Sequence, residues 1–264
     1  MITKVMKIKL FLQSILLFVT QSCLAGQGQP SNWQKGFQEP ASPVMRQISE
    51  VHDMVMIIIS CIGVLVIGLV LYAVWRFRES KNPKPAKFSH NTTLEIIWTS
   101  IPVLILIVLA IPTFKLIYYM DRVPKADMTV KVIGHQWYWS YEYPDHGDFG
   151  FDSYMIPDEQ LQPGQPRLLA VDNPVVVPVN NNIRIIATSE DVIHSWAVPS
   201  FGVKKDTVPG RINETWFRAE KEGMFYGQCS ELCGPQHGFM PIAVKVISQE
   251  SFDQWIKESQ ERWG

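Results

Sequence analysis

Cysteine is scarce in this sequence, with four residues among 264. Cys23 lies near the N-terminus and Cys61 lies in a long apolar run, so only Cys229 and Cys233 belong to the polar part of the chain. Small exported domains that depend on disulfides carry many cysteines in a short chain. The cysteine count therefore excludes a disulfide-stabilised scaffold.

Motifs for binding a nucleotide phosphate are missing as well. The sequence contains neither GxGxxG nor the phosphate-binding loop GxxxxGK[ST], and it has no internal repeat and no low-complexity segment. Nothing in the sequence thus points to a nucleotide-dependent enzyme.

Acidic charge is sparse in the first half of the chain and abundant in the second. Residues 1–125 hold 13 Lys and Arg against 6 Asp and Glu, a net charge of +7, whereas residues 126–264 hold 11 against 19, a net charge of −8. An acidic domain repels the phosphates of nucleic acid, which excludes that class of partner. It suits a basic protein partner that is attracted electrostatically.

The N-terminus has the pattern of a secretory signal peptide. Lys4, Lys7 and Lys9 precede the short apolar run LFLQSILLFV, and the small residues that end at Ala25 resemble a cleavage site. We predict that residues 1–25 are a cleaved signal peptide and that residues 26–53 form a segment on the outer face of a membrane.

Two apolar runs are long enough to cross a membrane as helices, at residues 54–75 and 94–120. The loop between them, residues 76–93, carries five Lys and Arg against one Glu. The positive-inside rule puts this loop on the cytoplasmic or matrix side. We expect a transmembrane hairpin in a bacterial inner membrane or a mitochondrial inner membrane, with residues 126–264 in the periplasm or the intermembrane space.

Residues 126–264 have the pattern of a β domain. Short runs of β-branched and aromatic residues, such as MTVKVIGHQWYWSYEY and MPIAVKVIS, are separated by Pro, Gly, Asn and Asp. This spacing predicts an all-β sandwich or barrel, and the last run, SFDQWIKESQERW, predicts a short amphipathic helix.

The segment CSELCGPQHGFM, residues 229–240, is the strongest candidate for a functional site. Its two cysteines could form a disulfide, and Cys229, Cys233, His237 and the upstream His194 could bind zinc. Met240 favours copper, because thiolate and thioether ligands together suit that metal. One His from upstream, followed by Cys, His and Met on one loop, is the frame of a copper-binding β-sandwich. The second cysteine could let two thiolates bridge a pair of copper ions.

Longer motifs strengthen this interpretation. HSWAVPSFGVKKDTVPGR, YGQCSELCGPQHGFMPI, GHQWYWSYEY and FDSYMIP together resemble subunit II of the aa3-type haem–copper cytochrome c oxidases, from about residue 33 to the C-terminus. The resemblance implies a cupredoxin-like fold and an electron-transfer subunit that binds two copper ions in a centre called CuA. It implies that cytochrome c docks on the domain and that subunit I, with other oxidase subunits, is a partner beside the membrane lipid.

The resemblance also implies residue roles. The side-chain ligands of copper would be His194, Cys229, Cys233, His237 and Met240. Glu231 would bind copper through its backbone carbonyl and a magnesium ion, shared with subunit I, through its side chain, and Asp206 falls near that magnesium. Trp137 would be the residue through which electrons arrive from cytochrome c. The acids that would face cytochrome c are Glu142, Asp148, Asp172 and Asp191.

Glu95 has two interpretations. From its position alone, at the start of the second apolar run, it is a carboxylate at the membrane interface, where a charge costs little free energy. The family resemblance instead implies the mouth of a proton path into subunit I.

Three other protein classes share parts of this pattern. A quinol oxidase subunit has the same fold but lacks the copper ligands, which are present here. A nitrous oxide reductase domain has a similar copper centre but lacks the two spanning helices. A membrane-tethered copper carrier needs exposed, exchangeable ligands and no tryptophan for receiving electrons.

Overall fold

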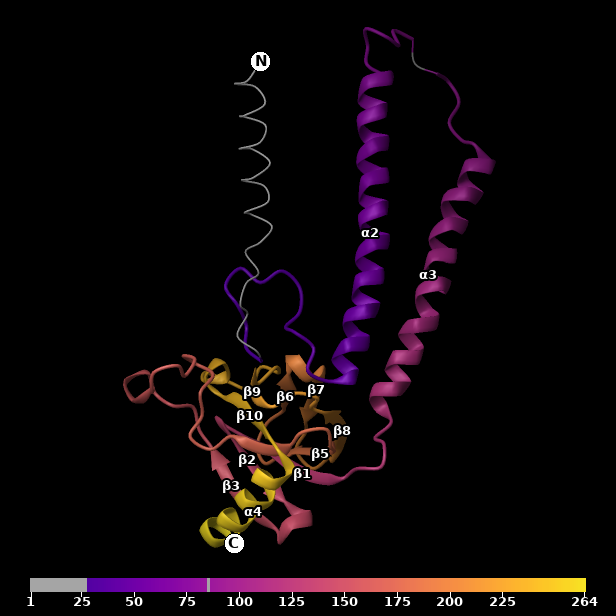
Figure 1. Cartoon of the computed structure of the whole chain (residues 1–264). Coiled ribbons are helices and arrows are strands. Elements are labelled where there is room, and N and C mark those ends of the chain that lie inside the picture. The colour runs from indigo at the N-terminus through magenta and orange to yellow at the C-terminus, as the bar shows by residue number, and fades with distance from the viewer. Residues whose placement is uncertain (1–27, 85) are drawn as a thin grey trace, which may run out of the picture.

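The computed structural model describes residues 28–84 and 86–264, so the predicted signal peptide lies outside the described residues. Two long helices, α2 (Pro43–Arg76) and α3 (Thr92–Asp121), rise from the same side of a β domain (Figure 1). Both have the length and composition to cross a membrane, and their large apolar side chains are exposed, as expected of surfaces that face lipid. The chain thus consists of a helical hairpin and a β domain, as predicted.

Helix α2 begins well before the apolar run that was predicted to span the membrane at residues 54–75. Ser42 caps the helix, because its Oγ accepts a hydrogen bond from the backbone N–H of Met45, and Pro43 occupies the first helical position. The same Oγ donates to the carbonyl of Phe201 in the β domain. Residues 43–53, predicted only as an outer segment, are therefore helical and join the membrane helix to the β domain.

Helix α3 is capped by Asn91, whose side chain accepts from the N–H of Leu94. Pro102 and Pro112 lie inside this helix, which membrane helices tolerate. Its last turns lead directly into the first strand of the β domain, so both helices are attached to the domain at the same end.

Ten short strands form the β domain within the described residues. They are β1 (Met128–His135), β2 (Tyr138–Tyr143), β3 (Phe149–Ser153), β4 (Val175–Pro178), β5 (Asn182–Ser189), β6 (His194–Val198), β7 (Val203–Thr207), β8 (Asn213–Arg218), β9 (Gly223–Gln228) and β10 (Pro241–Ile247). Short 3-10 turns lie at Pro144–His146, Asp158–Gln160, Pro199–Phe201 and His237–Phe239 (η4), and the C-terminal helix α4 is Gln249–Trp263.

The strands pair into three sheets, with orders β3-β2-β1-β5-β8, β4-β10-β9 and β6-β7. Most neighbours are antiparallel, but β1 with β5 and β4 with β10 are parallel. The parallel pairs join strands distant in sequence, as in a Greek-key sandwich. The predicted β-sandwich with a short C-terminal helix is confirmed.

Aromatic side chains fill the core between the sheets. On β2, Trp139, Tyr141 and Tyr143 alternate inward and are fully buried, as the two-residue period of a strand requires. Helix α4 closes one end of the core, where Trp255 packs 5.2 Å from the ring of Tyr143. Full burial of each large apolar side chain contributes about 2–3 kcal/mol, so this aromatic core holds the loops that it supports in fixed positions.

Three strands were not predicted, and they include the one that carries His194. Strand β7 has the sequence VKKDT. Its three central residues are all charged, so the sequence does not show the alternation of apolar and polar residues that predicts a strand. Strand β6 is its partner, and His194 is the first residue of β6 rather than part of a loop. Within another of the short apolar runs, RLLAVDNPVVVPV (residues 167–179), only Val175–Pro178 forms a strand.

Candidate metal centre

The loop of residues 229–240 joins β9, an edge strand of the three-stranded sheet, to β10, its central strand. Its two ends are tied together, because the N–H of Cys229 donates to the carbonyl of Met240. The N–H of Ser230 donates to the carbonyl of Ser195, which places the start of the loop beside β6. The fold therefore brings the loop to His194, although 35 positions separate His194 from Cys229.

The side chains of the five predicted ligands meet around the two cysteine sulfurs. Cys229 Sγ and Cys233 Sγ are 3.8 Å apart. His194 Nδ1 lies 3.9 Å from Cys229 Sγ, and His237 Nδ1 lies 3.5 Å from Cys233 Sγ. Met240 Sδ is 3.6 Å from Cys233 Sγ. A disulfide has a sulfur–sulfur bond of about 2.05 Å, so these cysteines are not linked to each other.

A sixth donor is the backbone carbonyl of Glu231, which lies 3.4 Å from Cys229 Sγ. We call these six residues the donor cluster: His194, Cys229, Glu231, Cys233, His237 and Met240. The side chain of Glu231 is exposed and does not join them.

Four of the six residues of the donor cluster are buried, and His237 is half-buried. His194 has no exposed surface, and Cys229, Cys233 and Met240 are buried. Six donors exceed the four that tetrahedral zinc takes. Two thiolates, two imidazoles and a thioether are donors that copper prefers, so the residues present fit a pair of soft metal ions better than zinc.

Burial and neighbouring groups shift the pKa values of the two thiols in opposite directions. Burial raises the pKa of the Cys229 thiol, but hydrogen bonds with His194 and with nearby backbone outweigh it and leave that pKa below its ordinary value. Burial and the adjacent Cys229 raise the pKa of Cys233. Two thiolates at this distance repel each other, so both are ionised together only when a cation lies between them.

Asp191 holds His194 in place from outside the donor cluster. Its Oδ1 lies 2.8 Å from His194 Nε2, and its Oδ2 accepts the backbone N–H of Gln136 at 2.6 Å. Burial lowers the pKa of His194, but its hydrogen bonds with Cys229 and Asp191 raise it above the ordinary value. Asp191 was predicted to dock cytochrome c, yet its carboxylate is only 33% exposed and is hydrogen-bonded to the donor cluster.

Close packing from β1 fixes the other side of His194. A Cβ added at Gly134 would lie 2.7 Å from the His194 ring and 2.9 Å from Thr207 Oγ1, distances that ordinary carbon atoms do not reach. Gly134 therefore lets β1 pass directly against the imidazole.

Trp137 lies in the turn between β1 and β2 and is in contact with the donor cluster. Its indole N–H donates to the carbonyl of Cys233 at 3.2 Å, and the side-chain amide of Gln136 donates to the same oxygen at 2.8 Å. A Cβ added at Gly234 would lie 3.1 Å from the Trp137 ring, so glycine is needed for this approach. Trp137 is partly exposed and thus connects the surface with Cys233.

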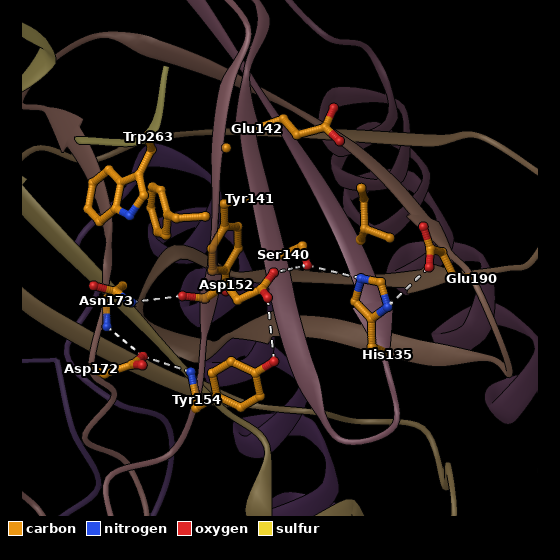
Figure 2. A pocket seen from close by; sticks show the side chains of 13 residues that line it. His135, Ser140, Tyr141, Glu142, Asp152, Tyr154, Asp172, Asn173, Glu190 and Trp263 are labelled. Carbon is orange, nitrogen blue, oxygen red and sulfur yellow. Dashed lines mark hydrogen bonds and ion pairs between the residues drawn. The ribbon is translucent and has the colours of Figure 1, made fainter. Parts of the chain in front are cut away.

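An open hollow of about 530 Å³ adjoins the same hairpin (Figure 2). His135, at the end of β1, bonds Ser140 at 3.0 Å and pairs with Glu190 at 3.5 Å, and Ser140 donates to Asp152 at 2.6 Å. We call this the acidic hollow, and its carboxylates come from Glu142, Asp152, Asp172 and Glu190.

The predicted docking acids differ in whether they line the acidic hollow. Glu142 and Asp172 line the acidic hollow, but Glu142 is paired with Lys131 at 2.8 Å. Asp148 is exposed on the turn before β3 and does not line the hollow. Asp152 and Glu190 do line it, and sequence reasoning missed both, although they lie in the motif FDSYMIP and directly before Asp191.

The remaining predicted residues lie away from the donor cluster. Asp206 is exposed on β7, opposite Ser195, whose carbonyl binds the N–H of Ser230 next to Glu231. Strand β6 thus lies between the segments that carry Asp206 and Glu231. Glu95 lies in the first turn of α3, where a carboxylate is favoured by the helix dipole.

Comparisons with known proteins agree with this arrangement. The family model described as "Cytochrome C oxidase subunit II, periplasmic domain" matches residues 128–247, and the model described as "Cytochrome C oxidase subunit II, transmembrane domain" matches residues 30–116. Together they cover α2, most of α3 and the sandwich from β1 to the end of β10.

Curated relatives match over most of their own length. The probable cytochrome c oxidase subunit 2 of Rickettsia bellii is 52% identical over 241 residues, which cover 91% of this chain and 89% of the relative. The cytochrome c oxidase subunit 2 of Chondrus crispus is 48% identical over 230 residues, which cover 85% of this chain and 91% of the relative.

Among solved structures, the periplasmic domain of subunit II of cytochrome oxidase from Bradyrhizobium japonicum is 57% identical, with a TM-score of 0.51. The match covers 54% of this chain and 100% of that domain. These findings confirm the resemblance that the sequence motifs indicated, and the chain belongs to the cytochrome c oxidase subunit II family.

Proposed function

We propose that this chain accepts electrons from cytochrome c at a dinuclear copper centre and passes them to a haem in subunit I, where oxygen is reduced to water with proton pumping. Membership of the subunit II family of a respiratory oxidoreductase supports an electron-transfer role. The observation that carries the proposal is the donor cluster, in which two cysteine sulfurs 3.8 Å apart are surrounded by two imidazoles, a thioether and a carbonyl.

The thiolates of Cys229 and Cys233, with the other members of the donor cluster, would hold two copper ions. Bound copper supplies a redox pair that stores one electron shared by two ions. The protein contributes rigidity and exclusion of water: the buried ligands are held by Asp191, by β1 and by the hydrogen bond that joins the ends of the loop. A donor set this complete suits electron transfer rather than substrate chemistry, which needs an open position on the metal.

Trp137 is proposed as the residue through which electrons arrive. Its partly exposed ring and its hydrogen bond to the Cys233 carbonyl support a continuous connection from the surface to a copper ligand. The acidic hollow beside the hairpin supports docking of a basic partner, because a concentration of one charge sign steers the approach of the opposite sign. Glu142, Asp148, Asp172 and Asp191 are proposed for this docking, and we add Asp152 and Glu190.

Two further assignments follow the family resemblance. Glu231 and Asp206 are proposed as the region of a magnesium ion at the contact with subunit I, supported by the exposure of both carboxylates and by strand β6, which pairs with β7 and accepts a hydrogen bond from Ser230. Glu95 is proposed as the mouth of a proton path, supported by its place at the membrane edge of α3, the side opposite the β domain.

The two spanning helices and the match to a periplasmic domain fit an inner-membrane protein. We propose that the β domain faces the periplasm, or the intermembrane space in a mitochondrion, and that the leader at residues 1–25 is cleaved.

A copper titration of residues 126–264 tests the central proposal. The Bradyrhizobium periplasmic domain was crystallised without its helices, which supports use of the isolated domain. We expect two copper ions for each domain, retained on dialysis. One zinc ion bound in preference to copper, or copper lost on dialysis, would contradict the proposal and favour a zinc site or a copper carrier.

A further inference from the structure

A second hollow, of about 450 Å³, lies where the two membrane helices meet the β domain. Gln47 of α2, Lys115 and Tyr119 of α3, Arg122 after α3, and Trp216 and Arg218 of β8 contribute to its lining. We call it the basic hollow. It is remote from the donor cluster in the fold, since none of the cluster residues lines it.

Positive charge is concentrated in the basic hollow without an acid among its lining residues. Glu220 forms ion pairs with both Arg218, at 3.7 Å, and Arg46. In the part of the chain that the structure describes, Lys115 and Arg122 have no ion-pair partner. The nearby Asp121 approaches Lys205 instead, at 4.0 Å. Three cations around one hollow repel one another unless an anion lies between them.

The walls of the basic hollow are aromatic. Tyr119 meets Trp216 edge to face, with 5.6 Å between the ring centroids. Trp216 is 5% exposed, and its indole N–H has no hydrogen-bond partner among the described residues. A buried N–H without an acceptor is unfavourable. Because protein covers this atom, it reaches an oxygen in the hollow only if the Trp216 ring shifts.

The position of the basic hollow along α3 is that of the membrane surface. Exposed apolar residues occupy the helix up to Phe114 and Ile117, Lys115 lies among the last of them, and Tyr118, Tyr119 and Arg122 follow at the end of α3. Tyrosine, tryptophan and the cationic ends of long side chains are enriched at the depth of lipid headgroups.

We propose that the basic hollow binds the phosphate headgroup of an anionic phospholipid from the leaflet on the side of the β domain. Arg122 and Arg218 hold the phosphate by charge-assisted hydrogen bonds, and Lys115 reaches it along the acyl side. Trp216 donates to a headgroup or ester oxygen. Because residues 126–264 carry a net charge of −8, local cations at this junction also let an acidic domain stay close to an anionic surface.

Native mass spectrometry of the purified oxidase that contains this chain tests the proposal. After exchange into detergent with phosphatidylglycerol, the wild-type complex is expected to retain one more phosphatidylglycerol than the double variant Arg122→Gln/Arg218→Gln. The loss of two charge-assisted contacts should weaken this binding about tenfold or more. Trp216→Phe, which keeps the ring but removes the N–H, should weaken it by a smaller factor.

Lys125→Gln is the matched control, because Lys125 is a nearby exposed cation that does not line the basic hollow. It should retain the lipid like the wild type. Equal retention in all variants, or equal loss in Lys125→Gln, would overturn the proposal. Release of subunit I from the double variant, seen in the same spectra, would show instead that the hollow is a subunit contact.

Two further measurements, with phosphatidylcholine and with inorganic phosphate, distinguish an anionic lipid from other molecules that carry a phosphate group. The proposal expects phosphatidylcholine to bind more weakly than phosphatidylglycerol and inorganic phosphate not to displace the lipid. Displacement of the lipid by inorganic phosphate at equal concentration would identify a site for free phosphate and contradict a lipid site.

Discussion

The donor cluster and the acidic hollow both adjoin the β1–β2 hairpin, but they are built in different ways. In the donor cluster, most ligands are buried, and hydrogen bonds with Asp191, with β6 and across the ends of the loop hold them in place. The acidic hollow is open, and several of its carboxylates already have partners, such as Lys131 for Glu142 and Ser140 for Asp152. A buried site depends on each member, whereas an open charged surface acts through the sum of its charges.

Cys233→Ser should have the largest effect, because it removes a thiolate that contacts Cys229, His237 and Met240. We expect the electron spin resonance signal of the copper pair to disappear and the full-length chain to bind one copper ion or none, as measured by metal analysis. Cys61→Ser is the control, since Cys61 is exposed on α2. A Cys233→Ser protein with an unchanged spectrum would contradict the role of Cys233.

Asp191→Asn should lower copper affinity about 10–100-fold, the usual cost of losing a partner that orients a metal-binding histidine. The measurement is competition with a copper chelator. Asp148→Asn, an exposed acid away from the donor cluster, should leave the affinity unchanged. If Asp191→Asn altered only the salt dependence of cytochrome c oxidation, Asp191 would be a docking acid and not a support for His194.

Trp137→Ala should leave the copper spectrum intact while slowing electron transfer from reduced cytochrome c. Loss of an aromatic residue at the centre of an interface costs about 2 kcal/mol, or roughly 30-fold in the second-order rate. Stopped-flow oxidation of cytochrome c measures that rate, with Trp33→Ala as the control because Trp33 is 95% exposed on another segment. An unchanged rate would show that electrons arrive elsewhere.

Neutralising the acidic hollow should have the smallest effect. Asp172→Asn with Glu190→Gln is expected to raise the KM for cytochrome c a few-fold at low salt, and the difference should vanish as salt screens the charges. Asp158→Asn is the control, since Asp158 pairs with Arg167 outside the hollow. Equal KM values at low salt would exclude the hollow as the docking surface.

Much of the fold and the donor cluster was predictable from sequence, for definite physical reasons. Long apolar runs have few alternatives to membrane helices, and the spacing C-x3-C-x3-H-x2-M places four donors on one loop. The upstream His194 was predictable as a donor but not as the start of a strand, because β7, its pairing partner, has a charged centre.

The acids could be assigned from sequence only as a group. Whether a carboxylate faces solvent or a histidine is decided by tertiary packing, as Asp191 and Glu190 illustrate: they are adjacent in sequence, yet Asp191 bonds His194 and Glu190 lines the acidic hollow. The basic hollow escaped prediction for the same reason, since Lys115 and Arg218 are far apart in sequence and meet only where α3 packs on β8.

The copper content and the electron spin resonance spectrum of residues 126–264 test the central claim most directly. The account predicts two copper ions and a hyperfine pattern from one unpaired electron shared equally by two copper nuclei. A single copper ion with a pattern from one nucleus would contradict it.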